Sequence, residues 1–223
     1  MRCYILFAFL SCVGSCLFAQ SQVGLLPQIN TDVRLGGDWK INAKLEGRQI
    51  FFQHPFPAEK SETKFERADL ELVATKTLSP STTVGGGYMF RWSDGKFIHR
   101  IIQQFTITQK LYGSRLLHRI RTDQTFEKDE ALQLRLRYRL SWEKPLSGLK
   151  VDANEFYLKI NNEYLGMLQG GKGNLEIRGL ANFGYSISDN NKIESGVDYR
   201  VEQLIQKIRV HKVFLNIAFY HSF

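Results

Sequence analysis

Residues 213–223, V-F-L-N-I-A-F-Y-H-S-F, end the chain on a segment in which apolar side chains recur at every second position. Those positions are Val213, Leu215, Ile217, Phe219 and Phe223. This period of two indicates a strand with one apolar and one polar face. Chain ends are usually frayed, so an amphipathic strand that stops on an aromatic residue indicates an end with a structural role. The pattern is typical of the closing strand of an outer-membrane β-barrel, and such a strand would be the contact for the barrel assembly machinery.

The same alternation is clearest at residues 132–142. Leu134, Leu136 and Tyr138 fall on one face of this segment, while Arg135, Arg137 and Arg139 fall on the other. A helix would scatter these arginines around its circumference, whereas a strand separates the two sets. The segment is therefore predicted to be a strand with an apolar face and a strongly basic face.

Ten strands of this kind are predicted along the chain, and the fold class is all-β, an antiparallel transmembrane β-barrel of about ten strands. They cover residues 39–51, 64–78, 82–92, 97–111, 115–126, 132–142, 149–163, 174–187, 192–204 and 207–223. Residues 22–35 also look strand-like, although Pro27 divides them. Because single-chain bacterial barrels have even strand counts, this segment is interpreted as a partial strand, a plug, or two short strands that complete a barrel of twelve.

The amino end has the layout of a secretory signal peptide at residues 1–19: Arg2, an apolar stretch, then Ala19. The apolar stretch of roughly sixteen residues is shorter than the roughly twenty that a membrane helix needs. All three cysteines, Cys3, Cys12 and Cys16, lie in this segment, so cleavage after Ala19 would leave a chain without disulfides or thiolate ligands. The alternative is a lipoprotein processing box at residues 13–16, with Cys16 lipidated.

Residues 20–223 are enough for one barrel domain and leave no room for a second. The full chain carries a net charge of +8. Because a secreted chain rarely meets nucleic acid, the expected partners of this charge are outer-membrane lipid, lipopolysaccharide and a small anion. No cofactor is expected, and the histidines and acids form no spacing that predicts a metal site.

Connection lengths and tryptophans predict an orientation in the outer membrane. Long connections are expected at 52–63 and 164–173, and outer-membrane barrels carry their long loops outside the cell. Short breaks at 36–38, 79–81, 112–114, 144–148 and 188–191 would then be periplasmic turns. Trp39 and Trp142 fall at periplasmic strand ends and Trp92 at an external end, as expected for aromatic girdles at the membrane interfaces.

A secreted β-sandwich or lipocalin-like barrel would also alternate in polarity. The alternation alone does not say which face lies inside. The charged polar faces, the continuous apolar band, the terminal phenylalanine and the placement of the tryptophans favour the membrane barrel.

Five arginines lie on two consecutive predicted strands, 115–126 and 132–142. Centring the hairpin on its loop places Arg119 opposite Arg139, Arg121 opposite Arg137, and Asp123 opposite Arg135. Like charges that face each other destabilise a sheet, so carboxylates are expected from other strands. Glu155 is predicted to lie about opposite Arg139. The candidates across the lumen are Asp69, Glu71, Asp198 and Glu202.

Two interpretations of this cluster remain open. A lattice of ion pairs would fill the lumen, because a barrel of about ten strands has little space beyond its own side chains. Alternatively the guanidinium groups would bind or conduct a small anion. A third alternative for the protein, separate from this cluster, is a lipid-modifying outer-membrane enzyme, with His54 and His99 as candidate residues and Ser93 and Asp94 near His99. No G-x-S-x-G motif accompanies either histidine, so the protein is predicted to be non-enzymatic.

Several short runs resemble one known family. They are H-R-I-R-T-D-Q at 118–124, R-L-R-Y-R-L at 135–140, Pro145-Leu146, Glu155-Phe156-Tyr157 and the aromatic closing strand. The chain resembles, over its whole mature length, a family of outer-membrane barrel proteins of Gram-negative bacteria that is known as a domain of unknown function, the 2490 type. The resemblance implies a barrel in the outer membrane, and it offers no known activity to carry over to the residues of this chain.

Overall fold

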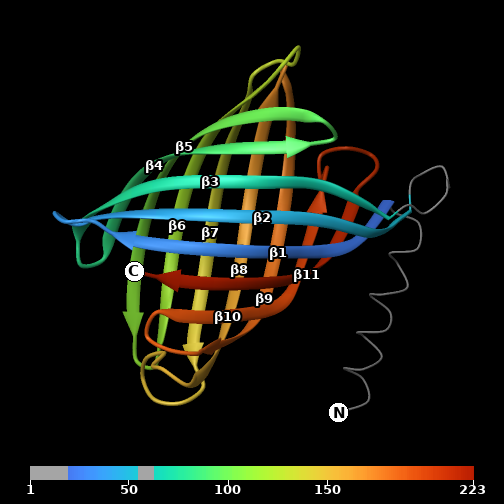
Figure 1. Ribbon diagram of the computed structural model, residues 1–223. Coiled ribbons are helices and arrows are strands. Elements are labelled where there is room, and N and C mark those ends of the chain that lie inside the picture. Colours follow the sequence, from blue (N-terminus) through green and yellow to red (C-terminus); the bar gives the residue numbers. More distant parts are fainter. Residues whose placement is uncertain (1–19, 55–62) are drawn as a thin grey trace, which may run out of the picture.

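The described part of the chain, residues 20–54 and 63–223 of the computed structural model, forms one closed β-barrel. Consecutive strands are neighbours around the wall, and the first pairs with the last (Figure 1). No helix in this part is long and apolar enough to cross a membrane. The strands are β1 (Gln20–Arg34), β2 (Trp39–His54), β3 (Lys64–Ser79), β4 (Thr82–Ser93), β5 (Lys96–Leu111), β6 (Ser114–Glu127), β7 (Gln133–Pro145), β8 (Glu155–Gln169), β9 (Lys172–Ser186), β10 (Asn191–Glu202) and β11 (Val210–Ser222).

The wall built from the described residues has eleven strands, one more than the predicted count of about ten and one fewer than the alternative of twelve. The additional strand is β1, which takes up nearly all of the segment 22–35. It pairs with β11 in parallel, from Gln20 beside Val210 to Asp32 beside Ser222, and with β2 in antiparallel fashion. In a ring of strands that alternate in direction, an odd count leaves the first and last strands parallel. The even count expected of a bacterial barrel does not hold here.

Pro27 lies in the middle of β1 and interrupts only one of the two ladders of that strand. The β1–β2 pairing stops at Leu25–Gln49 and resumes at Gln28–Glu46, while the pairing with β11 continues through Pro27. Proline has no backbone N–H to donate, which explains the gap on one side. Gly47 lies opposite, and a Cβ placed on it would be 3.3 Å from Cγ of Pro27. The wall has an apolar hollow of about 390 Å³ at this point, lined in part by Ile29, Leu45 and Phe65.

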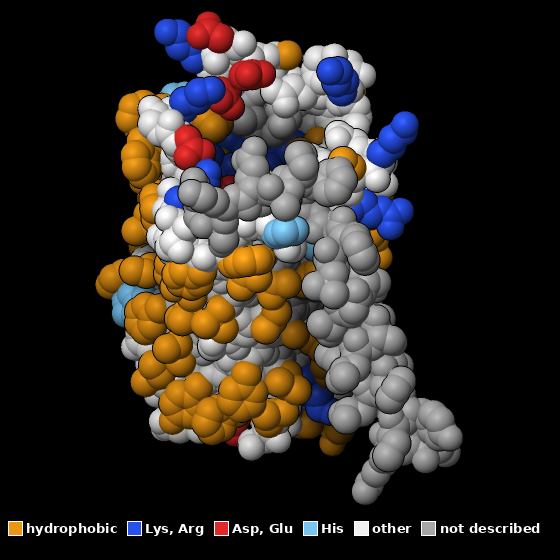
Figure 2. Space-filling view, turned by 90° about the vertical axis from the view of Figure 1, so that its right-hand side faces the viewer, with side chains coloured by type: hydrophobic (Ala, Val, Ile, Leu, Met, Phe, Trp, Pro, Cys, Tyr) orange, Lys and Arg blue, Asp and Glu red, His pale blue; other side chains and the backbone are white. Residues whose placement is uncertain are grey.

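The two faces of the wall have opposite chemistry. On β7, Leu136 is 58% exposed, whereas Arg137 beside it is 9% exposed and faces the lumen. Large apolar side chains are exposed on every strand, among them Leu72, Ile101, Ile160, Phe183 and Leu215. Figure 2 shows apolar side chains over much of the wall, with charged ones gathered at one end. The barrel is therefore apolar outside and mostly polar inside, apart from a buried apolar cluster of Leu26, Ile50 and Phe214; the alternation alone left this undecided.

The apolar outer band is interrupted near the middle of β5 and β6. Gln103 donates to Gln124 Oε1 at 3.0 Å, Gln124 donates back to Gln103 Oε1 at 3.2 Å, and Thr122 Oγ1 donates to the same oxygen at 2.8 Å. These exposed amides and the hydroxyl satisfy part of their hydrogen-bonding capacity with one another. The expectation of a continuous apolar band is wrong at this place.

The expected alternation of long and short connections is also wrong. β8 continues to Gln169 and reaches β9 through Gly170 and Gly171 alone, both at positive φ (54° and 77°), so 164–173 is a hairpin and not a long loop. Two residues at positive φ form the tight turn that suits twisted hairpins. Conversely, the break predicted at 144–148 is part of a longer connection at 146–154. Most of the predicted loop 52–63 lies outside the described residues, as does the predicted signal peptide at 1–19.

The closing strand and the tryptophans lie where the sequence places them. Val213, Leu215, Ile217 and Phe219 point outward on β11, while Phe214, Asn216 and Ala218 are buried in the lumen, and Phe223 is exposed beyond the strand. Trp39 begins β2 and Trp142 lies close to the end of β7, so they share one end of the barrel, and Trp92 lies at the other. Trp39 and Trp92 are exposed, and Trp142 is half-buried.

Candidate functional site

The arginine hairpin of β6 and β7 has the register expected from its loop. Arg119 pairs with Arg139, Arg121 with Arg137, and Asp123 with Arg135. All of these side chains lie on the lumen face, which is the buried face of both strands. The predicted pairing is confirmed, and four arginines stand in two directly opposed pairs.

Asp123 is the carboxylate at the centre of this cluster and is completely buried. Arg135 Nε donates to its Oδ1, Arg137 Nη2 lies 3.0 Å from Oδ2, and Arg100 Nε lies 3.3 Å from Oδ1. Arg100 comes from β5 and was not among the predicted residues, although it shares the inward parity of its strand. One negative charge is thus shared by three positive ones.

Glu71 reaches this cluster from β3, which is not a neighbour of β6 in the wall. Arg121 Nη1 donates to both carboxylate oxygens at 3.0 Å, and Nη2 donates to Gln104 Oε1 at 2.8 Å. The expectation of a carboxylate supplied from across the lumen is confirmed for Glu71. Such a contact joins parts of the wall that are not neighbours.

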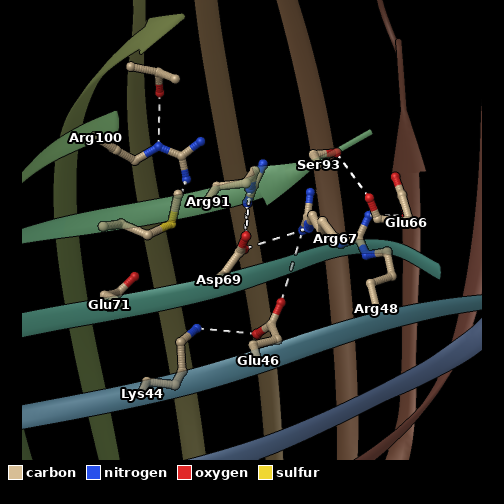
Figure 3. Close-up of polar contacts among 12 residues, drawn as sticks. Lys44, Glu46, Arg48, Glu66, Arg67, Asp69, Glu71, Arg91, Ser93 and Arg100 are labelled. Carbon is tan, nitrogen blue, oxygen red and sulfur yellow. Dashed lines mark hydrogen bonds and ion pairs between the residues drawn. The ribbon is translucent and has the colours of Figure 1, made fainter. Parts of the chain in front are cut away.

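Asp69 belongs to a second group on the lumen face of β2, β3 and β4 (Figure 3). Arg91 donates to both of its oxygens at 2.6 Å through Nε and Nη2, and Arg67 Nε lies 3.6 Å away. In the same group Glu46 lies 3.2 Å from Lys44 Nζ and 4.0 Å from Arg67 Nη2. Asp69 is therefore a lumen carboxylate, as predicted, but its partners are not the arginines of β6 and β7.

Glu155 is not the partner of Arg139, and this prediction is wrong. Glu155 is the first residue of β8, pairs with Ser186, and accepts a hydrogen bond from the backbone N–H of Asp152 at 3.3 Å. The residue opposite Arg139 is Glu163, whose Oε2 accepts from Arg139 Nε at 2.8 Å. The strand begins six residues later than predicted, so the register moves toward the carboxyl end of the chain.

Asp198 and Glu202 also pair elsewhere. Arg200 donates to both oxygens of Asp198 at 2.8 and 2.9 Å, and Lys212 Nζ lies 2.9 Å from Glu202. These contacts lie on β10 and β11, so neither acid compensates the arginine hairpin.

Glu194 on β10 is a lumen group that sequence reasoning missed. It accepts from Tyr157 Oη at 2.9 Å, from Lys159 Nζ at 2.8 Å, from Asn182 Nδ2 at 2.8 Å and from Tyr220 Oη at 3.2 Å. The sequence around Glu194 does not indicate this role, because the partners of Glu194 come from β8, β9 and β11 and not from its own strand. The carboxylate is fully satisfied and links four strands.

Positive charge is in excess around the arginine hairpin. Six arginines from β5, β6 and β7 face three carboxylates, Glu71, Asp123 and Glu163, and Glu163 also contacts Arg178 Nη1 at 3.3 Å. Within the described residues, Arg119 forms neither a hydrogen bond nor an ion pair, and the carboxylates of Glu163 and Glu71 act on its charge only from a distance. Buried N–H groups of Arg121 (Nε), Arg137 (Nε) and Arg135 (Nη2) also have no acceptor there. Buried donors are nearly always satisfied, so these exceptions mark a place with unused capacity for an anion.

Within the described residues, His99, Ser93 and Asp94 each contact other partners and do not form a triad. His99 Nδ1 contacts Tyr88 Oη on the outer face, while Ser93 Oγ donates to the carbonyl of Glu66 and Asp94 lies 3.9 Å from Lys64. His54 is the last residue of β2, and residues 55–62 after it lie outside the description. Over residues 20–54 and 63–223, no group of three or more His, Cys, Asp or Glu side chains could hold a metal ion.

A family model described as "Protein of unknown function (DUF2490)" matches residues 24–211, which is most of the barrel. No curated protein and no solved structure matches the chain. The matched range contains the arginine hairpin and ends at the beginning of the closing strand β11 (Val210–Ser222).

Proposed function

Since the chain belongs to the DUF2490 family of proteins of unknown function, we propose a function from the chemistry of the barrel itself. We propose that the protein is an outer-membrane β-barrel protein of a Gram-negative bacterium. In this proposal a cleaved signal peptide at 1–19 delivers the chain to the envelope. The barrel has a structural or interaction role, and it is not an enzyme. Its partners are outer-membrane lipid, lipopolysaccharide and, through β11, the barrel assembly machinery.

The observation that carries the proposal is the inverted polarity of the wall. Soluble barrels keep apolar side chains inside, whereas here Leu72, Leu136 and Leu215 are exposed and Glu71, Arg121 and Asp123 are buried. A monomeric soluble protein rarely exposes a contiguous apolar surface of this extent. Lipid is the solvent in which such a surface is stable. The strands have 12 to 16 residues, which at about 3.3 Å per residue is long enough to cross an apolar band of about 25 Å even when tilted.

The lumen contacts support a structural role. Glu71 joins β3 to β6, and Glu194 joins β8, β9, β10 and β11. Arg48 and Arg200 lie 4.7 and 5.3 Å from the ring centroid of Phe214, which is itself fully buried. Charged and aromatic side chains therefore occupy the interior and brace the wall from within.

The test is cell fractionation of the full chain expressed in a Gram-negative host. We expect the protein in the outer-membrane fraction after a carbonate wash, shortened at its amino end, and with a gel mobility that changes on boiling. Its recovery in the soluble periplasm would contradict the membrane placement. Labelling with palmitate would show that Cys16 is lipidated instead of removed.

The second candidate function is a small anion-conducting or anion-binding pore, and the excess of lumen arginines favours it. Single-channel recording in a planar bilayer across a salt gradient distinguishes the structural barrel from the anion pore. The braced lumen predicts no steady conductance, and Arg137→Ala should then lower thermal stability only. Steady anion-selective steps, shifted toward cations by Arg137→Ala, would establish the pore instead.

A further inference from the structure

We propose that the lumen holds a resident binding site for a small, doubly charged tetrahedral oxyanion, of the phosphate or sulfate class, between Arg119 and Arg139. This site deepens the anion-binding alternative of the proposed function. It rests on the lumen contacts alone and requires neither conduction nor placement in a membrane.

The first step is the direct opposition of the two guanidinium groups. Arg119 and Arg139 are paired residues of neighbouring antiparallel strands. Such residues have Cβ atoms only about 4.5–5.5 Å apart, and like charges at this distance destabilise the sheet. Arg119 has no acceptor within the described part of the chain. An anion between the two side chains would turn this repulsion into two attractions.

The second step is that the nearby carboxylates are already engaged. Arg139 uses Nε for Glu163, which is shared with Arg178. Glu71 accepts from Arg121, and Asp123 serves three other arginines. Both Nη groups of Arg139 and all five N–H donors of Arg119 therefore remain for a ligand.

The third step is that the Arg119–Arg139 pair is accessible to an ion from solvent. Arg121 and Arg137 are buried, whereas the side chain of Arg139 is 31% exposed and Arg119 is half-buried. Arg119 lies five residues from the first residue of β6, closer to that mouth of the barrel than its buried neighbours. The open pair can thus receive an ion, and the buried pair behind it adds positive potential.

The class of ion follows from the shape of the two donors. A guanidinium group binds an oxyanion through two parallel hydrogen bonds. A carboxylate presents only one such edge, so it would satisfy one arginine and leave the other. A tetrahedral oxyanion has pairs of oxygen atoms on opposite sides, so it can accept two hydrogen bonds from each of the two guanidinium groups at once. A dianion also matches two cations.

The test titrates the purified full-length barrel in detergent, after removal of multivalent anions, at constant ionic strength. Inorganic phosphate, sulfate and glycerol 3-phosphate are added in separate arms, with chloride as the reference, and binding is followed by calorimetry and by the unfolding temperature. Saturable stabilisation by phosphate or sulfate beyond that of chloride supports the site. Saturation by glycerol 3-phosphate alone also supports it and would show that the ligand is a phosphate monoester such as a lipid headgroup. Saturation by none of the three contradicts the proposal.

The decisive variant is Arg119→Gln, because in the described residues Arg119 forms no direct hydrogen bond or ion pair whose loss would unfold the barrel. We expect binding about tenfold to hundredfold weaker, as for the loss of a charge-assisted hydrogen-bonding group. Without added anion, this variant should unfold at the same or a higher temperature than the unmodified chain. The matched control is Arg115→Gln on the same strand, whose arginine is exposed and paired with Glu143 at 2.9 Å. Full binding in Arg119→Gln, or equal loss in both variants, would overturn the site.

Discussion

At the residue scale, the barrel interior depends on a few carboxylates that each serve several cations. Asp123 faces three guanidinium groups, and Glu194 accepts from four side chains. Removing one partner of a buried ion pair costs more than the pair itself contributes, because the remaining charge stays buried and uncompensated. These acids are therefore the positions where a small chemical change should have a large effect.

Asp123→Asn should destabilise the barrel by about 3–5 kcal/mol, the range for breaking a buried ion pair. The amide has nearly the same shape but no charge, so Arg100, Arg135 and Arg137 would repel one another without compensation. Urea unfolding in lipid vesicles measures the change. Asp152→Asn is the control, since its ion pair with Lys150 is highly exposed, and exposed pairs contribute only about 0–1 kcal/mol. Equal stability of the two variants would show that Asp123 does not hold the cluster together.

At the element scale, glycines decide where strands can carry large lumen side chains. Gly184 on β9 lies under the ring of Tyr157 on β8, and a Cβ at this position would overlap the ring. The absent side chain leaves Tyr157 free to lie across the strand and donate to Glu194. Gly179 on the same strand has nothing within 4 Å of an added Cβ.

Gly184→Ala should therefore lower stability by about 1–3 kcal/mol, the usual cost of overpacking a filled interior. Gly179→Ala should leave stability unchanged or raise it slightly, because alanine restricts the unfolded chain. The unfolding temperature of both variants, read from the heat-dependent gel shift, gives the comparison. If Gly184→Ala is as stable as Gly179→Ala, Tyr157 does not occupy the space above Gly184.

The strands themselves follow from local pattern better than their limits do. The register of the β6–β7 hairpin depends only on a short loop and on alternation, and it was predicted residue by residue. The start of β8 was misplaced, because residues 149–154 form a loop with Asn154 at positive φ (62°), although their apolar residues alternate. That single error moved the partner of Arg139 from Glu155 to Glu163.

At the scale of the whole molecule, closure by a parallel β1–β11 pair is the least expected feature. It can be tested by cysteine cross-linking, since residues 20–223 contain no cysteine. Ile29 and Phe219 are paired across the seam and both point outward. The double variant Ile29→Cys with Phe219→Cys should form a disulfide on oxidation, seen as a changed mobility of the unfolded chain.

The control pair is Leu45→Cys with Phe219→Cys. In the eleven-stranded barrel these residues lie two strands apart, about 9–10 Å, which is too far for a disulfide. In a barrel closed by β2 and β11 they would be neighbours. Cross-linking of the control pair and not of the first pair would contradict the parallel seam.

By itself the sequence determined the approximate positions of most strands, the alternation of faces and the pairing within the arginine hairpin, because each depends on neighbours along the chain and on the period of two. It did not determine which face lies inside, the strand count, or the partners supplied by Glu71, Glu163 and Glu194. Those depend on how the ring closes, since closure sets which strands meet across the seam and which side chains face each other across the lumen. Only the tertiary structure brings five arginines into ion pairs with three carboxylates, and it places Arg119 beside them without a direct hydrogen bond or ion pair in the described chain.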